Sequence, residues 1–237
     1  MTKLNKYARQ TRLLVAVDCI IFGFDGTQLK ILLIKRVLQP LKGNWSLMGG
    51  FIGSAESADE AAERILKKLT GLSGVYLEQM HCFGDPKRDT IERTISVAYF
   101  ALIDIHKYKE QISHEYHAEW FALNEIPKLL FDHASMIEMG RKKLQYKAAL
   151  HPILFELLPA KFTLPQLLIL YEAFYDASID KRNFTRKVQT TGLLVKLNEK
   201  DKDGSKKGAF YYKLNRVNYR SNLQAFLYIV PNAHKLF

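Results

Sequence analysis

Acidic side chains cluster in the stretch GGFIGSAESADEAAERILKKLTGL, which spans residues 49–72. Three glutamates would lie there on roughly one face of a helix: Glu56, Glu60 and Glu63. Grouped carboxylate oxygens are the ligands that Mg²⁺ prefers, so these side chains could form a metal site. However, Glu60 precedes Arg64 by four residues and Glu63 precedes Lys67 by four, which is the spacing of surface ion pairs. The sequence favours the ion pairs over the metal site.

Basic and amide side chains mark a second candidate site, in the stretch DKRNFTRKVQTT at residues 180–191. If this stretch is a helix, Phe184 and Val188 lie at positions i and i+4 and face inward. The outward positions then carry the following residues: Lys181, Arg182, Thr185, Arg186, Lys187 and Gln189. Arginine can bond to guanine and glutamine to adenine in the major groove of DNA. Asn183 would either contact a base or cap the helix, and a solvated basic surface is the alternative interpretation of the whole stretch.

The elements that must position these side chains form two groups, of which the first is α/β. Apolar and β-branched runs predict strands over residues 13–24, 29–36 and 92–105, and Asp25-Gly26 is a turn signal between the first two. Apolar residues at helical spacing predict one helix that ends at Gly71. Another is expected from about Asp132, a good N-cap, to about Ala148. Strands with interleaved helices predict an α/β domain over residues 1–150.

The second group has the order of a winged helix-turn-helix domain, which we expect over residues 151–237. Three residues give independent signals for the start of its first helix: Thr163, Pro165 and Gln166. A second helix is expected between Asp180 as N-cap and Gly192 as the stop, followed by two strands around a charged loop. The lysines of this loop would contact DNA phosphates: Lys200, Lys202, Lys206 and Lys207.

Composition narrows the class of protein. Of the 237 residues, 48% are hydrophobic, which excludes a mainly disordered chain. Cys19 and Cys82 are too few for a disulfide framework, and no apolar run reaches the roughly 18 residues that a membrane span needs. We therefore expect a cytoplasmic protein. The net charge of +11 is concentrated in residues 181–237, which hold 13 Lys and Arg but 3 Asp and Glu, and such a segment favours phosphate binding.

The first domain resembles the Nudix hydrolases, whose box reads G-x5-E-x7-R-E-U-x-E-E-x-G-U, with U an aliphatic residue. The chain matches this frame at Gly50, Glu56, Arg64, Leu66, Gly71 and Leu72. The three family glutamates that bind metal map onto Ile65, Lys68 and Leu69. A divalent cation loses its oxygen ligands there and meets an ammonium group instead. We therefore expect a Nudix-like α/β/α sandwich that is not an enzyme and holds neither metal nor cofactor.

A Nudix-like domain without those glutamates, followed by a winged helix, resembles the NrtR family of Nudix-related transcriptional regulators. The most specific blocks are LLPAKFTLPQLLILYEAF (residues 157–174) and DKRNFTRKV (residues 180–188), and LEQMHCFGDPKRDT and FDHASMI extend the resemblance. The family implies a homodimer, formed largely through the Nudix domains, that binds a palindromic operator and releases it when a small molecule fills the Nudix pocket. The helix expected at about 132–148 would link the two domains. Some members respond to ADP-ribose, others to sugars, including an L-arabinose-responsive AraR-type branch.

Residues in the predicted loops and at strand ends are the candidates for binding this effector: Lys35, Asn44, Trp45, Glu56, Lys87, Arg88 and Asp89. A tryptophan ring can stack on a sugar whose hydroxyls bond to amide and carboxylate groups, although core packing is the alternative role for Trp45. The cationic side chains could equally clamp a diphosphate. We expect a repressor of sugar catabolism genes that L-arabinose or another pentose releases. The alternatives are an ADP-ribose-responsive regulator of NAD metabolism, a weak Nudix pyrophosphohydrolase and a general nucleic-acid-coating protein.

Overall fold

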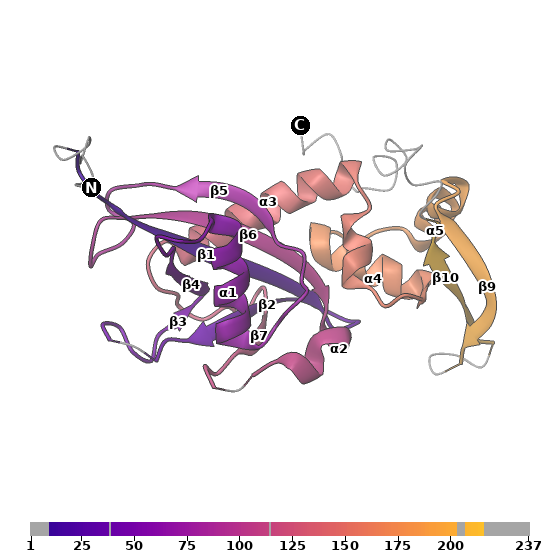
Figure 1. Cartoon of the computed structure of the whole chain (residues 1–237). Coiled ribbons are helices and arrows are strands. Elements are labelled where there is room, and N and C mark those ends of the chain that lie inside the picture. The colour runs from indigo at the N-terminus through magenta and orange to yellow at the C-terminus, as the bar shows by residue number, and fades with distance from the viewer. Residues whose placement is uncertain (1–9, 38, 114, 203–206, 216–237) are drawn as a thin grey trace.

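The computed structural model describes residues 10–37, 39–113, 115–202 and 207–215 and divides them between an α/β domain and a smaller winged domain (Figure 1). The strands of the α/β domain are β1 (Leu14–Phe24), β2 (Leu29–Lys35), β3 (Trp45–Ser46), β4 (Met48–Phe51), β5 (Glu78–Phe83), β6 (Thr94–Asp104) and β7 (Glu119–Ala122). Its helices are α1 (Ala58–Thr70), the short α2 (Ile105–Tyr108), the 3₁₀ turn η1 (Lys109–Gln111) and α3 (His133–Leu150). The expected hairpin, the strand near 92–105 and both helices are confirmed within two residues at each end.

Strand β1 is the centre of the sheet. It runs parallel to β6 over its whole length, from the pair Leu14 and Thr94 to the pair Phe24 and Asp104. Its other edge pairs antiparallel with β4 through residues 16–19 and with β2 through residues 21–24. The partner strand therefore changes partway along β1, and the box loop begins where β4 leaves the sheet.

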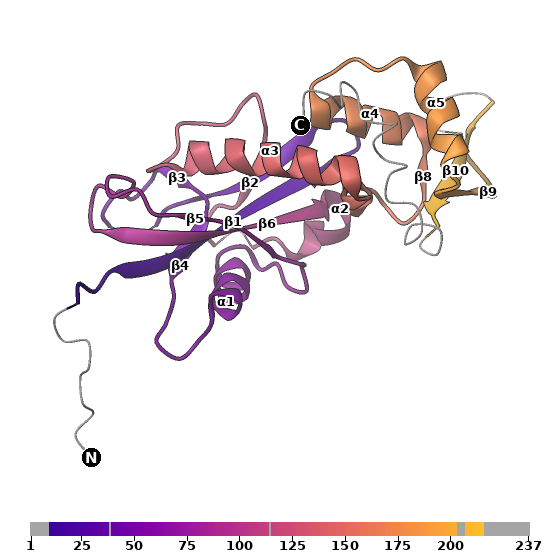
Figure 2. The ribbon, with the colours of Figure 1, turned by 90° about the horizontal axis from the view of Figure 1, so that it is seen from above.

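The sheet is covered on both faces, by α1 on one side and α3 on the other (Figure 2). The side chains of β1 alternate between the faces, as the two-residue period of a strand requires. Val17, Cys19 and Ile21 pack in the α1 cluster, whereas Ile20 and Phe22 pack in the α3 cluster. The expected α/β/α sandwich is confirmed.

Helix α1 begins and ends as its local sequence dictates. Ser57 accepts a hydrogen bond from the Glu60 N–H, and the Glu60 carboxylate accepts one from the Ser57 N–H, which completes a capping box. Gly71 ends the helix in the left-handed region at φ 81°, and its N–H donates to the Lys67 carbonyl.

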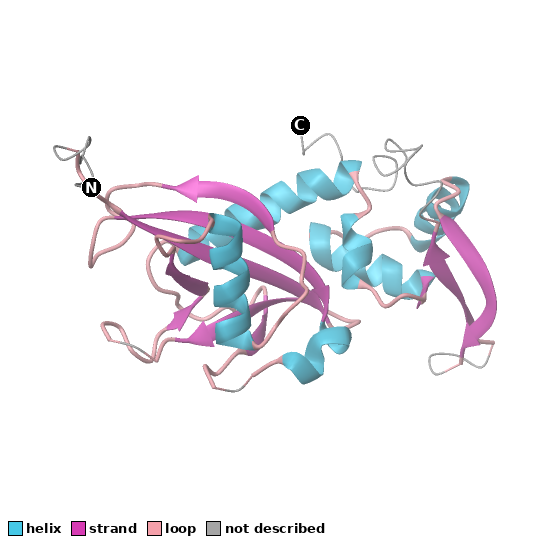
Figure 3. Cartoon of the chain, viewed as in Figure 1, coloured by secondary structure: helices cyan, strands magenta, loops and turns pink. Residues whose placement is uncertain are grey.

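The winged domain contains η2 (Ile153–Leu157), β8 (Phe162–Thr163), α4 (Leu164–Tyr175), α5 (Lys181–Thr190), β9 (Leu194–Asp201) and β10 (Ala209–Leu214), with the strands in the order β8-β10-β9 (Figure 3). Thr163 and Gln166 form a capping box at the start of α4, and Asp180 caps α5, both as expected. Gly192 follows α5 at φ 67°, in agreement with the predicted stop.

The two domains share apolar contacts. One buried cluster contains Phe100 of β6 and Leu144 of α3 together with Leu154, Phe162 and Leu170 of the winged domain. The division at residues 150 and 151 falls where α3 ends, but the buried surface is continuous across it.

Candidate functional site

The three positions at which the Nudix box carries metal-binding glutamates have separate environments. Ile65 is only 3% exposed and packs in the α1 core, Lys68 is exposed to solvent, and Leu69 is half-buried and lines a pocket. Among the described residues, no group of three or more His, Cys, Asp or Glu side chains is arranged to hold a metal ion.

Glu56, the acidic residue that the box retains, is bound to Arg64. Nε and Nη2 of Arg64 donate to the two Glu56 oxygens at 2.8 and 2.6 Å, and the Gly53 N–H donates to the same carboxylate at 2.7 Å. These hydrogen bonds, those from Arg64 first, lower the pKa of Glu56 to about 2. The expected pairing of Glu60 with Arg64 is therefore wrong, because Glu60 closes the capping box instead.

Both box glycines are needed because side chains approach them closely. A Cβ atom on Gly49 would lie 2.2 Å from Asp18 Oδ1, and one on Gly50 would lie 2.7 Å from Ile65 Cδ1. A side chain at either position would therefore force Asp18 or Ile65 to shift. Gly49 lies opposite Asp18 in the pairing of β4 with β1, and Gly50 faces Ile65 of α1.

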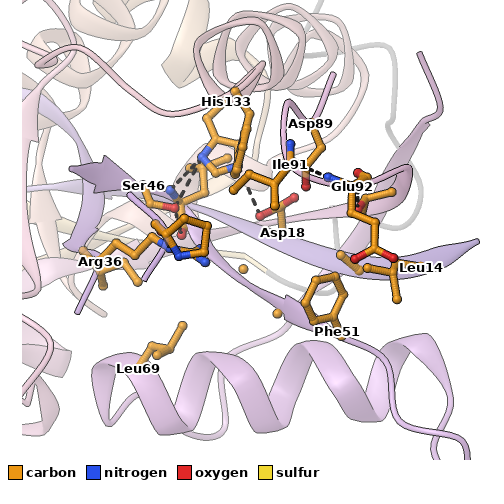
Figure 4. Close-up of a pocket in the computed structure, with 18 of the residues that line it drawn as sticks. Leu14, Asp18, Arg36, Ser46, Phe51, Leu69, Asp89, Ile91, Glu92 and His133 are labelled. Atoms are coloured by element: carbon orange, nitrogen blue, oxygen red, sulfur yellow. Dashed lines mark hydrogen bonds and ion pairs between the residues drawn. The ribbon is translucent and has the colours of Figure 1, made fainter. Parts of the chain in front are cut away.

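A cavity of about 440 Å³ lies between the β1–β4 edge, the loop around residues 88–94 and the start of α3 (Figure 4). Its wall combines charged, aromatic and aliphatic side chains: Leu14, Asp18, Arg36, Phe51, Leu69, Arg88, Asp89, Ile91, Glu92, Tyr116, Phe131 and His133. Of the seven candidate effector residues, Arg88 and Asp89 line this cavity. Asp89 also holds its own loop, since its carboxylate accepts a hydrogen bond from the Ile91 N–H.

The other five candidates do not line this cavity. Trp45 packs edge-on against Phe121 at 4.8 Å between ring centroids, and the Lys35 ammonium lies 5.4 Å from the Trp45 ring. The Asn44 amide donates to the Leu41 carbonyl within its own loop, and Glu56 is held by Arg64 as described above. Lys87 is exposed to solvent. A role for these five in effector binding stays a prediction.

A buried polar network, not predicted from the sequence, forms the floor of the cavity. Asp18, 5% exposed, lies in the middle of β1 and accepts a hydrogen bond from Ser96 Oγ at 2.6 Å. Arg88 Nη2 lies 3.5 Å from Asp18 and donates to Asp132 at 2.8 Å, and Arg88 Nε donates to the other Asp132 oxygen at 3.0 Å. A buried carboxylate needs such partners. Asp18 interrupts an otherwise apolar strand, and this is the signal that could have revealed the site.

His133 completes the network from the start of α3. Its Nδ1 accepts a hydrogen bond from the Leu47 N–H at 3.2 Å, so Nε2 carries the proton and faces Asp18 Oδ1 at 3.5 Å. Burial lowers the pKa of this imidazole. The ring is therefore neutral at pH 7 and fixes α3 against β1.

The second candidate site is the outer face of α5. Phe184 and Val188 are buried, as expected, at 1% and 2% exposure. Five of the predicted contact residues are exposed: Lys181, Arg182, Asn183, Arg186 and Gln189. Thr185 and Lys187 are half-buried, Lys207 is exposed at the loop between β9 and β10, and Lys206 lies outside the described residues.

Two of these side chains have partners within the winged domain. Asn183 does not cap α5, as one interpretation expected, because Asp180 does so; instead its Oδ1 accepts a hydrogen bond from Arg186 Nη2 at 3.0 Å. Gln189 Nε2 donates to the Tyr212 hydroxyl of β10 at 3.5 Å. The basic face of α5 is thus held in a defined arrangement with the wing.

Comparison with known families finds two matches along the chain. Residues 12–140 match the NUDIX domain, and residues 154–214 match the NrtR DNA-binding winged helix domain. None of the helices in the described ranges combines the length and apolar character of a membrane span.

Three of the proteins that are similar to the chain are described here in turn. An "ADPR responsive transcriptional repressor NtrR" of Acinetobacter baylyi is 34% identical over 218 residues, which are 90% of this chain and 87% of the relative. The ADP-ribose pyrophosphatase of Methanocaldococcus jannaschii is 36% identical over 136 residues, 57% of this chain and 77% of the relative. The crystal structure of Shewanella oneidensis NrtR complexed with a 27mer DNA superposes with a TM-score of 0.75 at 30% identity and covers 87% of this chain and 95% of that one.

Proposed function

Because the chain belongs to the NrtR family of DNA-binding transcriptional regulators, we propose that it is a repressor that ADP-ribose releases from its operator. The observation that carries this proposal is the similarity to an ADPR-responsive repressor along 90% of the chain, which includes both the pocket and the winged helix. An ADP-ribose pyrophosphatase among the relatives of the first domain points to the same ligand.

The cavity offers groups that suit ADP-ribose. Its volume of about 440 Å³ falls within the range of about 300–1,000 Å³ for small-molecule sites. Arg36 and Arg88 lie in its wall, and guanidinium groups bind phosphate oxygens without a metal. Glu92 can accept hydrogen bonds from ribose hydroxyls, and the aromatic rings of Phe51 and Tyr116 can pack against an adenine base.

The earlier preference for a sugar such as L-arabinose is not supported. None of the three relatives described above is named for a sugar, and two are named for ADP-ribose. Trp45, on which the stacking argument for a sugar relied, packs against Phe121 outside the cavity. The alternative of an ADP-ribose-responsive regulator therefore replaces the sugar interpretation.

We further propose that the first domain binds ADP-ribose without hydrolysing it. The box helix presents a buried isoleucine, an exposed lysine and a pocket-lining leucine where a Nudix hydrolase presents carboxylates. Metal-assisted attack of water needs those oxygens. The ion pair between Arg64 and Glu56 is retained from the box, and it holds the loop before α1 in place.

Operator binding is assigned to α5 and the wing. Arg182, Arg186 and Gln189 would contact base edges, and the lysines of the β9–β10 hairpin would contact phosphates. A homodimer would present two such helices at a fixed separation, matched to half-sites about one helical turn or a multiple apart. An effector that prefers a different separation lowers the operator affinity.

The test is a release experiment. A fluorescent duplex is first selected by the protein from random 27mers, the length of the DNA in the relative's complex, and its binding is followed by anisotropy. ADP-ribose should dissociate the complex, whereas L-arabinose should not. Arg186→Ala is the matched control, since it should lose the operator and still bind ADP-ribose in calorimetry. Release by L-arabinose alone would reinstate the sugar effector, and equal affinity for random duplexes would indicate a coating protein.

Hydrolysis is measured in parallel. The protein with Mg²⁺ should leave ADP-ribose intact, as judged by the absence of AMP and ribose 5-phosphate in chromatography. Steady production of both, lost in Glu56→Gln, would identify an active pyrophosphohydrolase.

A further inference from the structure

Arg88 lines the cavity and also binds Asp132, the residue that precedes α3. Its side chain is 3% exposed, and its guanidinium forms a two-pronged contact with Asp132, through Nε at 3.0 Å and Nη2 at 2.8 Å. The same side chain lines the cavity in which the effector is proposed to bind. An anion in that cavity would therefore compete with Asp132 for the guanidinium.

Asp132 occupies the N-cap position of α3 but does not cap the helix. Aspartate is among the best N-cap residues, because its carboxylate accepts hydrogen bonds from the open N–H groups of the first turn. Here its side chain makes no such bond and points to Arg88 instead. The sequence-based expectation of a capped helix is thus wrong in this state. The carboxylate has two mutually exclusive partners, Arg88 and the first turn of α3.

Helix α3 transmits its position to the DNA-binding domain. Near its other end, Gln145 Nε2 donates to the Phe174 carbonyl of α4 at 3.0 Å, and the Tyr175 hydroxyl donates to the Gln145 carbonyl at 3.2 Å. Leu144 and Ala148 of α3 are fully buried in the cluster that also contains Leu170 of α4. A change in the position or orientation of α3 must therefore move α4 as well or break these contacts.

We propose that Arg88 and Asp132 form a latch between the effector cavity and the winged domain. In the operator-binding state Arg88 holds Asp132; diphosphate oxygens of the effector take over the guanidinium, and Asp132 turns to cap α3. With the effector bound, one charge-assisted contact replaces another; without it the guanidinium has no such replacement, so Arg88 keeps Asp132. The latch rests on the proposed function, because it assumes an anionic effector and an operator-bound default state.

Asp132→Asn separates this latch from a merely structural ion pair. Asparagine caps helices as well as aspartate but lacks the charge that holds Arg88. Arg88 keeps Asp18 as its counter-charge, so the variant leaves no buried charge without a partner. Glu138→Gln is the matched control, because it removes a carboxylate from the same helix at an exposed pair with Lys142.

The experiment measures the operator affinity of the effector-free variants by anisotropy, with active concentrations from stoichiometric titration. Asp132→Asn should bind the selected duplex at least about tenfold more weakly than wild type. Hydrogen exchange at residues 134 and 135, whose N–H groups the cap would bind, should be slower than in wild type. Glu138→Gln should match wild type in both. Wild-type affinity in Asp132→Asn, with unchanged exchange, would overturn the latch.

Further measurements distinguish a failure of the latch proposal from a failure of the proposal that ADP-ribose is the effector. If Asp132→Asn folds poorly, Asp132→Ser provides a second uncharged cap. In the wild-type protein, ADP-ribose should slow hydrogen exchange at residues 134 and 135. If Asp132→Asn binds the operator weakly and ADP-ribose does not release the wild-type protein, the latch is supported and ADP-ribose is refuted as the effector. Release of wild type and Asp132→Asn by ADP-ribose from equal starting affinities supports the effector and refutes the latch.

Discussion

Replacement of Arg88 by methionine tests whether the buried network holds the first domain together. Methionine fills much of the arginine volume but leaves the carboxylates of Asp18 and Asp132 without their cation. These side chains are 7% and 20% exposed, so water replaces the lost partner poorly, above all at Asp18. Removal of one partner from a buried ion pair costs about 3–5 kcal/mol of unfolding free energy.

The matched control is Arg64→Met, which breaks an equally well-formed arginine–carboxylate contact at the surface. Arg64 is 47% exposed, and exposed pairs are screened by solvent, so we expect a much smaller loss. Comparing the two variants tests the effect of burial, since each replaces an arginine that is bound to a carboxylate by methionine.

Urea unfolding followed by tryptophan fluorescence provides the assay. Trp45 and Trp120, the two tryptophans of the chain, both lie in the first domain, so the signal reports on the part of the molecule that holds the network. With a slope of about 3 kcal/mol/M, Arg88→Met should lower the urea midpoint by about 1 M or more. A midpoint equal to that of Arg64→Met would refute the conclusion that the network stabilises the fold.

Three more predictions follow from the described residues. Arg186→Ala should weaken binding to the selected duplex by more than about 1 kcal/mol with an unchanged thermal midpoint; an unchanged gel-shift midpoint would remove Arg186 from the contact surface. Lys202→Ala combined with Lys207→Ala should flatten the plot of log affinity against log salt by about 1–2 units, because each phosphate contact releases counterions, and an unaltered slope would place both lysines away from the DNA. The pKa of His133 lies below its unfolded value of 6.5, so unfolding takes up a proton below that pH and stability should fall as the pH drops from 7 to 5. His133→Asn, which keeps an acceptor for the Leu47 N–H, should lose less stability over this range in urea unfolding at each pH.

Local sequence rules predicted the helices and the frame of the box well. Caps such as Thr163 with Gln166, or Gly71 at the end of α1, act within a single turn, so the residues that decide them are neighbours in the chain. The apolar run of β1 and the concentration of positive charge after residue 180 are likewise visible in the sequence alone. These features were sufficient to predict an α/β first domain and a winged helix. The resemblance to the Nudix box added the α/β/α sandwich and the replacement of the three family glutamates by Ile65, Lys68 and Leu69.

Local rules failed where the partner lies far away in the chain. Asp132 should cap α3 by its position, but Arg88, 44 residues earlier, binds its carboxylate. Helical spacing predicted an ion pair between Glu60 and Arg64. In the structure, Arg64 instead donates to Glu56, which lies before the helix in the box loop.

The sequence by itself determined which side chains are present and which elements carry them. These are a box helix with Ile65, Lys68 and Leu69 in place of the family glutamates and a basic second helix in the winged domain. The tertiary structure alone decided which of them meet. Asp18 contacts Ser96 and His133 contacts Leu47 across separations of 78 and 86 residues. Such contacts depend on which strand edge pairs with which and on the face each side chain occupies. The physical reason is that a buried charge is stabilised by whatever partner the packed fold brings within reach, and chain proximity does not specify that partner.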